Sequence, residues 1–365
     1  MSKKSEIIRI WQECFPKDSP QWRRMFFDAA YVDEEALTES DPETGATVSS
    51  LLLLPYSMTF DGKPLGAAYI YGAGTLRKFR AKGHMGRLLH KALCEAADRG
   101  DSLAVLIPAS EMLRGYYSRY GFMSVFYRRP ERYTSVHRFP TEGSYVNMSD
   151  LAPAMLYPAF ERLMGNLDYC VQHSRAQFLT IMDDTRMSGY GFAAVSRAEG
   201  DSTPCAMVWS RQQDTSDDII VTELLAEDED AANAAISELQ KQMPGRPVTL
   251  MLQPADDYIG GHLTPYGMAR VVNPEDFLST IAEANPHLRL TIRLTDPILT
   301  ENTGVYTLNN GRLTVTDVPV SGCGQQRYDL DVNPETLTAL LFSSRPIADI
   351  TGLPARRPRM SLMLD

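Results

Sequence analysis

An internal repeat restricts the fold of this 365-residue chain more than any other feature. The run LAVLIPA ends in Pro108-Ala109, and Tyr120-Gly121 lies twelve residues after the proline. The run VTLMLQPA ends in Pro254-Ala255, and Tyr266-Gly267 follows at the same spacing. Each run is a short apolar stretch typical of a buried strand. Two segments with the same order of strand and loop signals predict a duplicated unit.

The elements before the two runs support the duplication. Helical periodicity covers 84–99 and 229–243, and an apolar strand pattern precedes each helix, at 67–76 and 219–225. Strand, helix and strand in this order predict a right-handed crossover between parallel strands of a mixed sheet. In the first unit, Leu51–Leu54 is expected to form a hairpin with the strand at 67–76.

A third region begins near Val271. Two helix starts there share one form, Asn273-Pro274-Glu275 and Asn333-Pro334-Glu335, with an Asn cap, a Pro and an acid in the first turn. Between them lies a hairpin expected to turn at Asn310-Gly311.

The predicted fold class is therefore α+β, with α/β-type mixed sheets in two similar units and a small α+β domain after them. The expected domains are 1–140, 141–269 and 270–365.

Composition excludes several classes of protein. The net charge of −10 argues against a nucleic-acid binder, and the longest apolar run, Leu51–Pro55, is too short for a membrane span. Five scattered cysteines without a CxxC pair, and six histidines without ligand spacing, predict neither disulfides nor a metal site. We therefore expect a cytoplasmic protein that contacts neither nucleic acid nor membrane and needs no metal.

One basic segment stands out in this acidic chain. Between residues 77 and 91 there are six basic side chains and no acid: Arg77, Lys78, Arg80, Lys82, Arg87 and Lys91. A solvated helix face would explain a charge run alone. This run, however, follows a strand, contains Gly83 and Gly86, and opens an amphipathic helix. Free amides at a helix N-terminus, close glycine backbone and nearby cations together predict an anion site.

The stretch GTLRKFRAKGHMGRLL, followed by YYSRYGF, resembles the coenzyme A-binding core of the GNAT superfamily of N-acetyltransferases. Arg80 and Gly83 match the first and fourth positions of that loop, whereas Met85 stands where Gly or Ala is usual; Gly86 would supply part of the lost room. The resemblance implies acetyl-CoA as co-substrate, held by Gly74, Thr75, Leu76, Arg80, Ala81, Lys82, Gly83, His84, Met85, Gly86 and Ser110. Ser110 could equally be a plain turn residue.

Two such units before a small α+β domain resemble acetyltransferases of the enhanced intracellular survival (Eis) type. That resemblance implies a sterol-carrier-like third domain, a chain end that returns to the first active site, and a homo-oligomer, in that group a hexamer. The second unit lacks the loop's charges, because Ala226 and Asp228 stand where Arg80 and Lys82 would be, and Leu263 replaces Tyr117. Only the first unit is expected to bind the co-substrate.

Two catalytic residues follow from the resemblance. Tyr117, four residues before Gly121, would be the general acid that protonates the departing thiolate; the alternative is a core or rim tyrosine. Asp365, the last residue, would supply a carboxylate, terminal or side-chain, that takes the proton of the amine through water. PRMSLMLD resembles a strand buried to its end, and the alternative is a tail that only closes the domain.

The sequence thus predicts an acetyl-CoA-dependent N-acetyltransferase that acts by direct attack of a primary amine. An aminoglycoside, a polyamine or a lysine side chain would be the acceptor. The alternatives are a lipid- or acyl-CoA-binding protein that uses the third domain, and a sensor that binds a polyamine or peptide without turnover.

Overall fold

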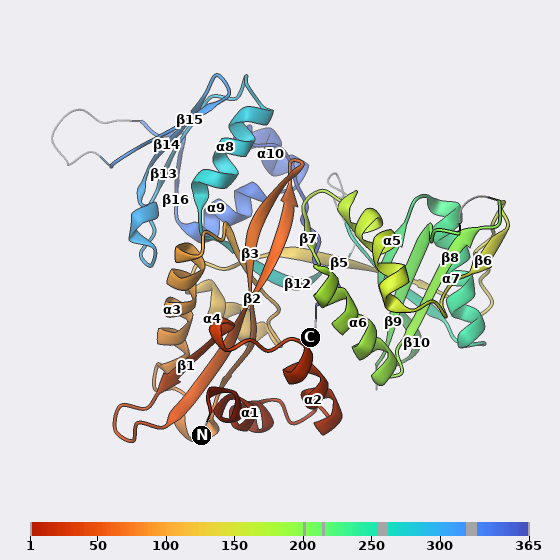
Figure 1. Ribbon diagram of the computed structural model, residues 1–365. Coiled ribbons are helices and arrows are strands. Elements are labelled where there is room, and N and C mark those ends of the chain that lie inside the picture. Colours follow the sequence, from red (N-terminus) through yellow and green to blue (C-terminus); the bar gives the residue numbers. More distant parts are fainter. Residues whose placement is uncertain (1, 200–201, 214–215, 255–261, 319–326, 364–365) are drawn as a thin grey trace.

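The computed structural model describes residues 2–199, 202–213, 216–254, 262–318 and 327–363. Figure 1 shows three groups of elements: the first unit in red and orange, the second in green, and the third in blue. No helix in these described ranges is long and apolar enough to cross a membrane.

The first unit contains two amphipathic helices, a sheet and two further helices. Its elements are α1 (Lys3–Cys14), α2 (Pro20–Ala29), η1 (Asp33–Glu35), β1 (Ala36–Ser40), β2 (Thr47–Phe60), β3 (Lys63–Thr75), η2 (Arg77–Phe79), α3 (His84–Asp98), β4 (Leu103–Leu106), α4 (Glu111–Ser118) and β5 (Met123–Tyr133). The predicted hairpin is confirmed by the antiparallel β2–β3 pair, and the crossover by the parallel β3–β4 pair.

The run of four leucines in β2 is explained by a sheet that is covered on both faces. Leu52 and Leu54 pack in the core that contains α1 and α2, whereas Leu51 and Leu53 pack in the core beneath α3. Successive side chains of a strand point to opposite faces, so an unbroken apolar run is required here.

The second unit repeats the pattern of a parallel strand pair joined by a helix. Its elements are β6 (Tyr145–Asn147), α5 (Pro153–Gly165), β7 (Cys170–Gln172), α6 (Arg175–Met187), β8 (Gly191–Arg197), β9 (Ala206–Gln213), β10 (Ser216–Ala226), α7 (Glu229–Gln242), β11 (Val248–Leu252) and β12 (Thr264–Val271). The parallel β10–β11 pair around α7 confirms the predicted second crossover.

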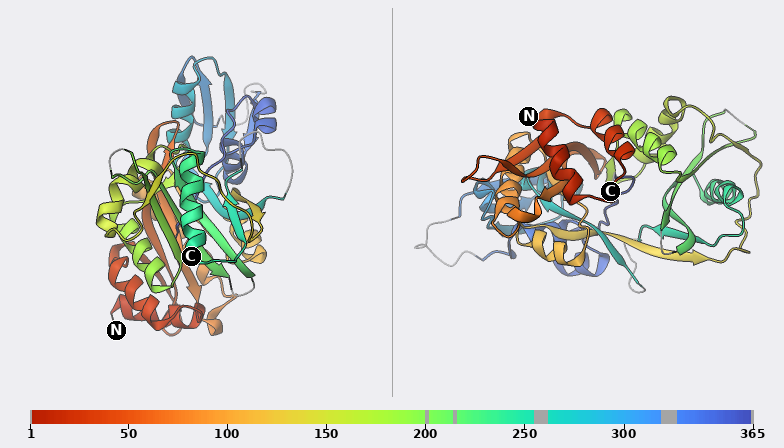
Figure 2. Two further views of the ribbon diagram at one scale, coloured as in Figure 1. Left: turned by 90° about the vertical axis from the view of Figure 1, so that its right-hand side faces the viewer. Right: turned by 90° about the horizontal axis from the view of Figure 1, so that it is seen from below.

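The two units share one sheet through exchanged strands. The order is β1-β2-β3-β4-β12-β5-β11-β10-β9-β8-β6, with β7 beside β2. β12 is the last strand of the second unit in sequence but lies between β4 and β5 of the first, and β5 continues into the second unit to pair with β11 (Figure 2). The two units therefore cannot separate without breaking strand pairs.

This exchange corrects part of the sequence interpretation. Tyr120-Gly121 follows α4, whereas Tyr266-Gly267 lies within β12, so the two dipeptides are not equivalent. Leu263 precedes β12 directly and is not on a helix that could replace α4. The predicted boundary at 269/270 falls inside β12; the division into three domains stays a prediction.

The third group is a small sheet covered by helices. It contains α8 (Pro274–Ala284), β13 (Leu290–Leu294), η3 (Thr300–Asn302), β14 (Gly304–Asn309), β15 (Arg312–Thr316), β16 (Leu330–Val332), α9 (Pro334–Leu341) and α10 (Arg345–Thr351), with strand order β15-β14-β13-β16. Both predicted caps are confirmed: Asn273 accepts from the Glu275 amide at 3.1 Å and Asn333 from the Thr336 amide at 2.8 Å. The predicted turn is confirmed by positive φ at Asn310 and Gly311.

Candidate active site

The site begins where two parallel strands diverge. β3 pairs with β4 only from Ala67 to Tyr69, and β3 then continues to Thr75. The register with β2 shifts there, so that Leu51 faces both Gly72 and Ala73 across a β-bulge. Gly72 has a φ of 58°, and a Cβ on it would lie 2.1 Å from the Trp11 ring. In the described part of the chain, the edge of β3 beyond residue 69 is left without a partner strand and can offer its backbone to a ligand.

The backbone of Gly74, Thr75 and Leu76 lies at the end of this open edge. Gly74 packs closely on α1, because a Cβ there would lie 3.0 Å from Cys14 Sγ. The Thr75 hydroxyl is 2.8 Å from Ser49 Oγ, and Leu76 is buried. The side chains of Thr75 and Leu76 thus point into the protein, and the backbone of this stretch is left to meet an extended ligand.

The loop after β3 ends at an uncapped helix N-terminus. Ala81 and Gly83 have left-handed φ values of 61° and 81°, and Gly83 occupies the N-cap position of α3. No side chain of the described part caps this helix, and its first turn contains no acid. The first amides and the helix dipole therefore remain available to an anion such as a pyrophosphate.

The basic side chains of the loop and of α3 lie at the protein surface. Arg77, Lys78, Lys82 and Lys91 are exposed. The Arg80 guanidinium is also exposed and donates to the Thr75 carbonyl at 3.0 Å, which ties the loop to the open strand. The positive charges of this cluster complement the negative charges of the three phosphate groups of coenzyme A.

The structure corrects one expectation for this helix, the room supplied by Gly86, and it places the His84 side chain; contacts of both residues with the co-substrate stay predictions. The His84 side chain is only 2 % exposed and lies 4.0 Å from Glu39 and 3.9 Å from Asp41, so only its backbone faces the anion site. Gly86 does not supply room for the ligand, because a Cβ there would lie 2.4 Å from the Tyr120 hydroxyl. Met85 is half-buried against the core beneath α3.

Ser110 is the N-cap of α4. Its Oγ accepts from the Leu113 amide at 3.4 Å, which accounts for this residue without a ligand. A contact between Ser110 and the co-substrate stays a prediction.

Tyr117 lies in the last turn of α4 and is 8 % exposed. Its ring packs against Tyr116 and Phe122, with centroid distances of 5.5 and 6.2 Å. Burial raises the pKa of Tyr117 to about 12. The phenol therefore carries its proton at neutral pH, as a general acid must.

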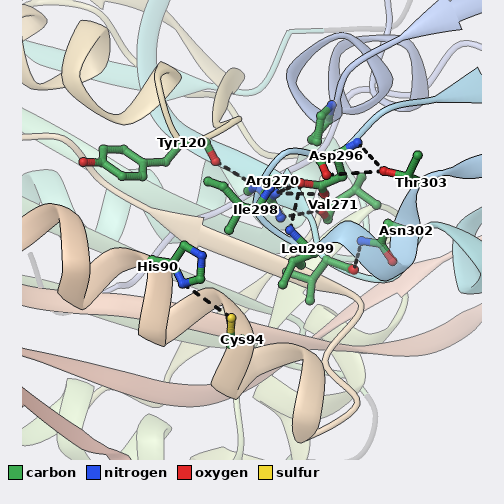
Figure 3. A network of polar contacts seen from close by, with 12 residues as sticks. His90, Cys94, Tyr120, Arg270, Val271, Asp296, Ile298, Leu299, Asn302 and Thr303 are labelled. Atoms are coloured by element: carbon green, nitrogen blue, oxygen red, sulfur yellow. Dashed lines mark hydrogen bonds and ion pairs between the residues drawn. The ribbon is translucent and has the colours of Figure 1, made fainter.

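A buried ion pair, which sequence analysis missed, holds the end of α4. Arg270 of β12 is fully buried and donates from Nε to the Tyr120 carbonyl at 2.8 Å (Figure 3). Its Nη2 lies 2.8 and 2.9 Å from the two carboxylate oxygens of Asp296 in the third group. Nothing in the local sequence distinguishes these residues from surface charges. The pair connects the helix that carries Tyr117 to the C-terminal domain.

The matching helix of the second unit offers no such anion site. Asp228 caps α7, and Asp230 accepts from the Glu142 and Gly143 amides at 2.7 and 3.0 Å. The chain before β6 therefore covers this helix start, where acidic side chains also repel phosphate. These contacts agree with the expectation that the first unit alone binds the co-substrate, which stays a prediction.

The described end of the chain, residues 360–363, is buried, but it does not form the predicted strand. Met360, Ser361, Leu362 and Met363 are all buried, so the expected alternation is absent. Pairing is limited to a bridge between Arg359 and Cys170, and Leu362 has a φ of 53°. Leu364 and the predicted catalytic Asp365 lie outside the described residues.

Comparisons with known proteins define the class. Residues 2–125 match the family described as acetyltransferase (GNAT) domain, and residues 274–351 match the sterol carrier protein domain. No curated protein matches the sequence. The chain therefore contains a GNAT acetyltransferase domain in residues 2–125 and a sterol carrier protein domain in residues 274–351.

Solved structures resemble nearly the whole chain. Eis1 from Mycobacterium abscessus aligns with a TM-score of 0.71 at 16% identity over 98% of this chain and 93% of its own. A GCN5-related N-acetyltransferase from Anabaena variabilis aligns with a TM-score of 0.74 at 14% identity over 97% and 92%. Another from Kribbella flavida reaches 0.71 at 16% identity over 96% and 90%. At these identities the likeness shows the fold, and the full-length arrangement is Eis-like.

Proposed function

We propose that this protein transfers acetyl from acetyl-CoA to a primary amine of an aminoglycoside, a polyamine or a lysine side chain. The observation that carries the proposal is the open edge of β3. This strand leads through a loop with exposed basic residues to the uncapped start of α3. A strand edge binds an extended amide-containing arm and a helix start binds phosphates, which are the two recognition features of coenzyme A.

In the proposed reaction, a bond forms between the amine nitrogen and the acetyl carbon while the bond from that carbon to sulfur breaks. The sulfur leaves as a thiolate, and the neutral phenol of Tyr117 donates the proton that it needs. The amine loses a proton as the amide forms, and a carboxylate of Asp365 accepts it through water. Backbone amides at the end of β3 would stabilise the negative charge that develops on the carbonyl oxygen.

The test is CoA release from acetyl-CoA with a panel of polyamines, aminoglycosides and lysine peptides, beside a titration with CoA. Turnover that is abolished by Arg80→Glu, a change that opposes the phosphates, would support the proposal. Tight CoA binding without turnover on any amine favours the sensor. Absence of CoA binding refutes the proposal and favours lipid binding by the C-terminal domain.

The expectation of a cytoplasmic homo-oligomer, a hexamer by resemblance, belongs to the same proposal. Light scattering on the purified chain measures the oligomer size, and a monomer at micromolar concentration would contradict it.

A further inference from the structure

The described part of the chain end, residues 359–363, is held by segments far away in the sequence. The Arg359 amide donates to the Tyr169 carbonyl at 2.7 Å, and the Val171 amide donates to the Arg359 carbonyl at 3.0 Å. Arg359 thus forms a single β-bridge with Cys170 of β7, and β7 itself pairs with β2. Chain ends usually fray, so a buried and bonded end indicates a specific docking position.

The sheet of the second unit supplies polar contacts to the same segment. The Ser361 hydroxyl donates to the Glu223 carboxylate, and the Arg359 guanidinium lies 3.5 Å from that carboxylate. Arg211 Nη2 donates to the Met363 carbonyl at 3.3 Å, two residues before the chain terminus. Glu223 is 6 % exposed, so its charge is taken out of water in order to meet the tail.

A β-bulge directs Glu223 toward the tail. Val221 pairs with Ser210 and Glu223 with Trp209, so Thr222 is an extra residue in β10. A bulge bends its strand and changes the direction of the side chains beside it. A buried carboxylate in a central strand is costly unless it is paired, and here its partners are the tail and the Leu224 amide at 2.8 Å.

The tail also passes the place where β3 and β4 diverge. The methyl group of Met360 occupies the space of a side chain on Gly267 of β12, since a Cβ there would lie 2.1 Å from Met360 Cε. The same Cβ would lie 3.3 Å from the carbonyl of Leu106, the last residue of β4. The docked tail is therefore adjacent to the open end of the proposed active site.

We propose that Glu223 and Arg211 of the second unit are positioning residues that hold the chain end for the acetyl transfer. The inference rests on the proposed function, in which the Asp365 carboxylate takes part. It assigns a task to a unit whose own helix start is covered by the chain before β6 and by Asp230. The second unit then serves the reaction through its sheet, which anchors the tail through Glu223 and Arg211.

The test compares Glu223→Gln in the full chain with the same substitution in a chain that ends at Met363. The matched control is Asp218→Asn, because Asp218 is a similarly buried acid of β10 that bonds Arg132 and Thr249 instead of the tail. We expect Glu223→Gln to lower kcat about 10- to 100-fold with little change in the KM for acetyl-CoA, since small displacements of reacting groups cost that much. Asp218→Asn should leave kcat unchanged. In the shortened chain Glu223→Gln should have no further effect.

Three results would overturn this inference and leave the proposed function standing. The first is a shortened chain with low kcat while Glu223→Gln remains fully active, and the second is an equal loss from Glu223→Gln in both backgrounds. Loss of kcat in Asp218→Asn as large as in Glu223→Gln would also overturn it, because the effect would then be structural. If the shortened chain keeps its kcat, the proposed role of the terminal carboxylate fails first. As a readout independent of activity, carboxypeptidase should release Asp365 faster from Glu223→Gln than from Asp218→Asn.

Discussion

The buried pair of Arg270 and Asp296 allows a quantitative prediction. Asp296→Ala removes a carboxylate that is 2 % exposed and accepts two bonds from one guanidinium. It also removes the acceptor of the Ile298 and Leu299 amides, at 2.9 and 3.0 Å. Arg270 is left fully buried, with only the carbonyls of Tyr120 and Val271 as described partners.

Breaking a buried pair by removing one partner costs about 3–5 kcal/mol, because an uncompensated charge remains in a low-dielectric interior. The two amides lose their acceptor as well, but water entering the space left by the carboxylate would recover part of that loss. We therefore expect Asp296→Ala to lower the free energy of unfolding by about 3–5 kcal/mol. Burial lowers the pKa of Arg270, and the guanidinium nevertheless stays protonated at neutral pH.

Urea unfolding followed by tryptophan fluorescence measures this loss. The control is Arg270→Met combined with Asp296→Ala, in which neither charge is buried; we expect it to recover at least about 1 kcal/mol relative to the single variant. Arg293→Ala, which breaks an exposed pair with Asp331, should cost less than about 1 kcal/mol. A single variant within 1 kcal/mol of the parent, or a double variant less stable than the single one, would refute the reasoning.

Three further predictions concern the site and the tail. Tyr117→Phe should lower kcat about 10²–10⁴-fold with acetyl-CoA binding retained in a titration, and loss of binding would make Tyr117 a structural residue. Gly86→Ala places a Cβ 2.4 Å from the Tyr120 hydroxyl, which must move, while the helix gains about 1 kcal/mol from the loss of a glycine. We therefore expect Gly86→Ala to be more stabilising in urea unfolding when Tyr120→Phe is also present, and an equal effect in both backgrounds would contradict the contact. Burial lowers the pKa of His173 to about 4, below its unfolded value near 6.5. The free energy of unfolding is therefore highest above pH 6.5 as far as this residue is concerned, and it decreases as the pH falls from 6.5 toward 4. His173→Gln should flatten this dependence in urea unfolding between pH 7 and pH 4, and an unchanged slope would show that other groups cause it.

Local chemistry made many elements predictable from the sequence. The Asn-Pro-Glu helix starts, the Asn310-Gly311 turn, the amphipathic face of α3 and the apolar runs of β2 and β4 all depend on residues close together in the chain. Backbone capping, positive φ and hydrophobic periodicity act over a few residues, and so their outcome can be read locally. The position of the candidate anion site followed from the same local rules.

The tertiary structure alone decided where distant segments meet. Equal spacing suggested that Tyr266-Gly267 is equivalent to Tyr120-Gly121. Strand exchange instead places Tyr266-Gly267 inside β12, because strand pairing depends on the neighbouring strands and not on spacing along the chain. Gly86 was expected to leave space for a ligand, but the hydroxyl of Tyr120, which follows α4, covers it. The partners of Arg270 and Glu223 lie 26 and 138 residues away, and charged residues carry no local sign of burial. The sequence by itself determined the elements and the loop of the candidate anion site, whereas long-range packing determined which side chains contact the end of α4 and the described end of the chain.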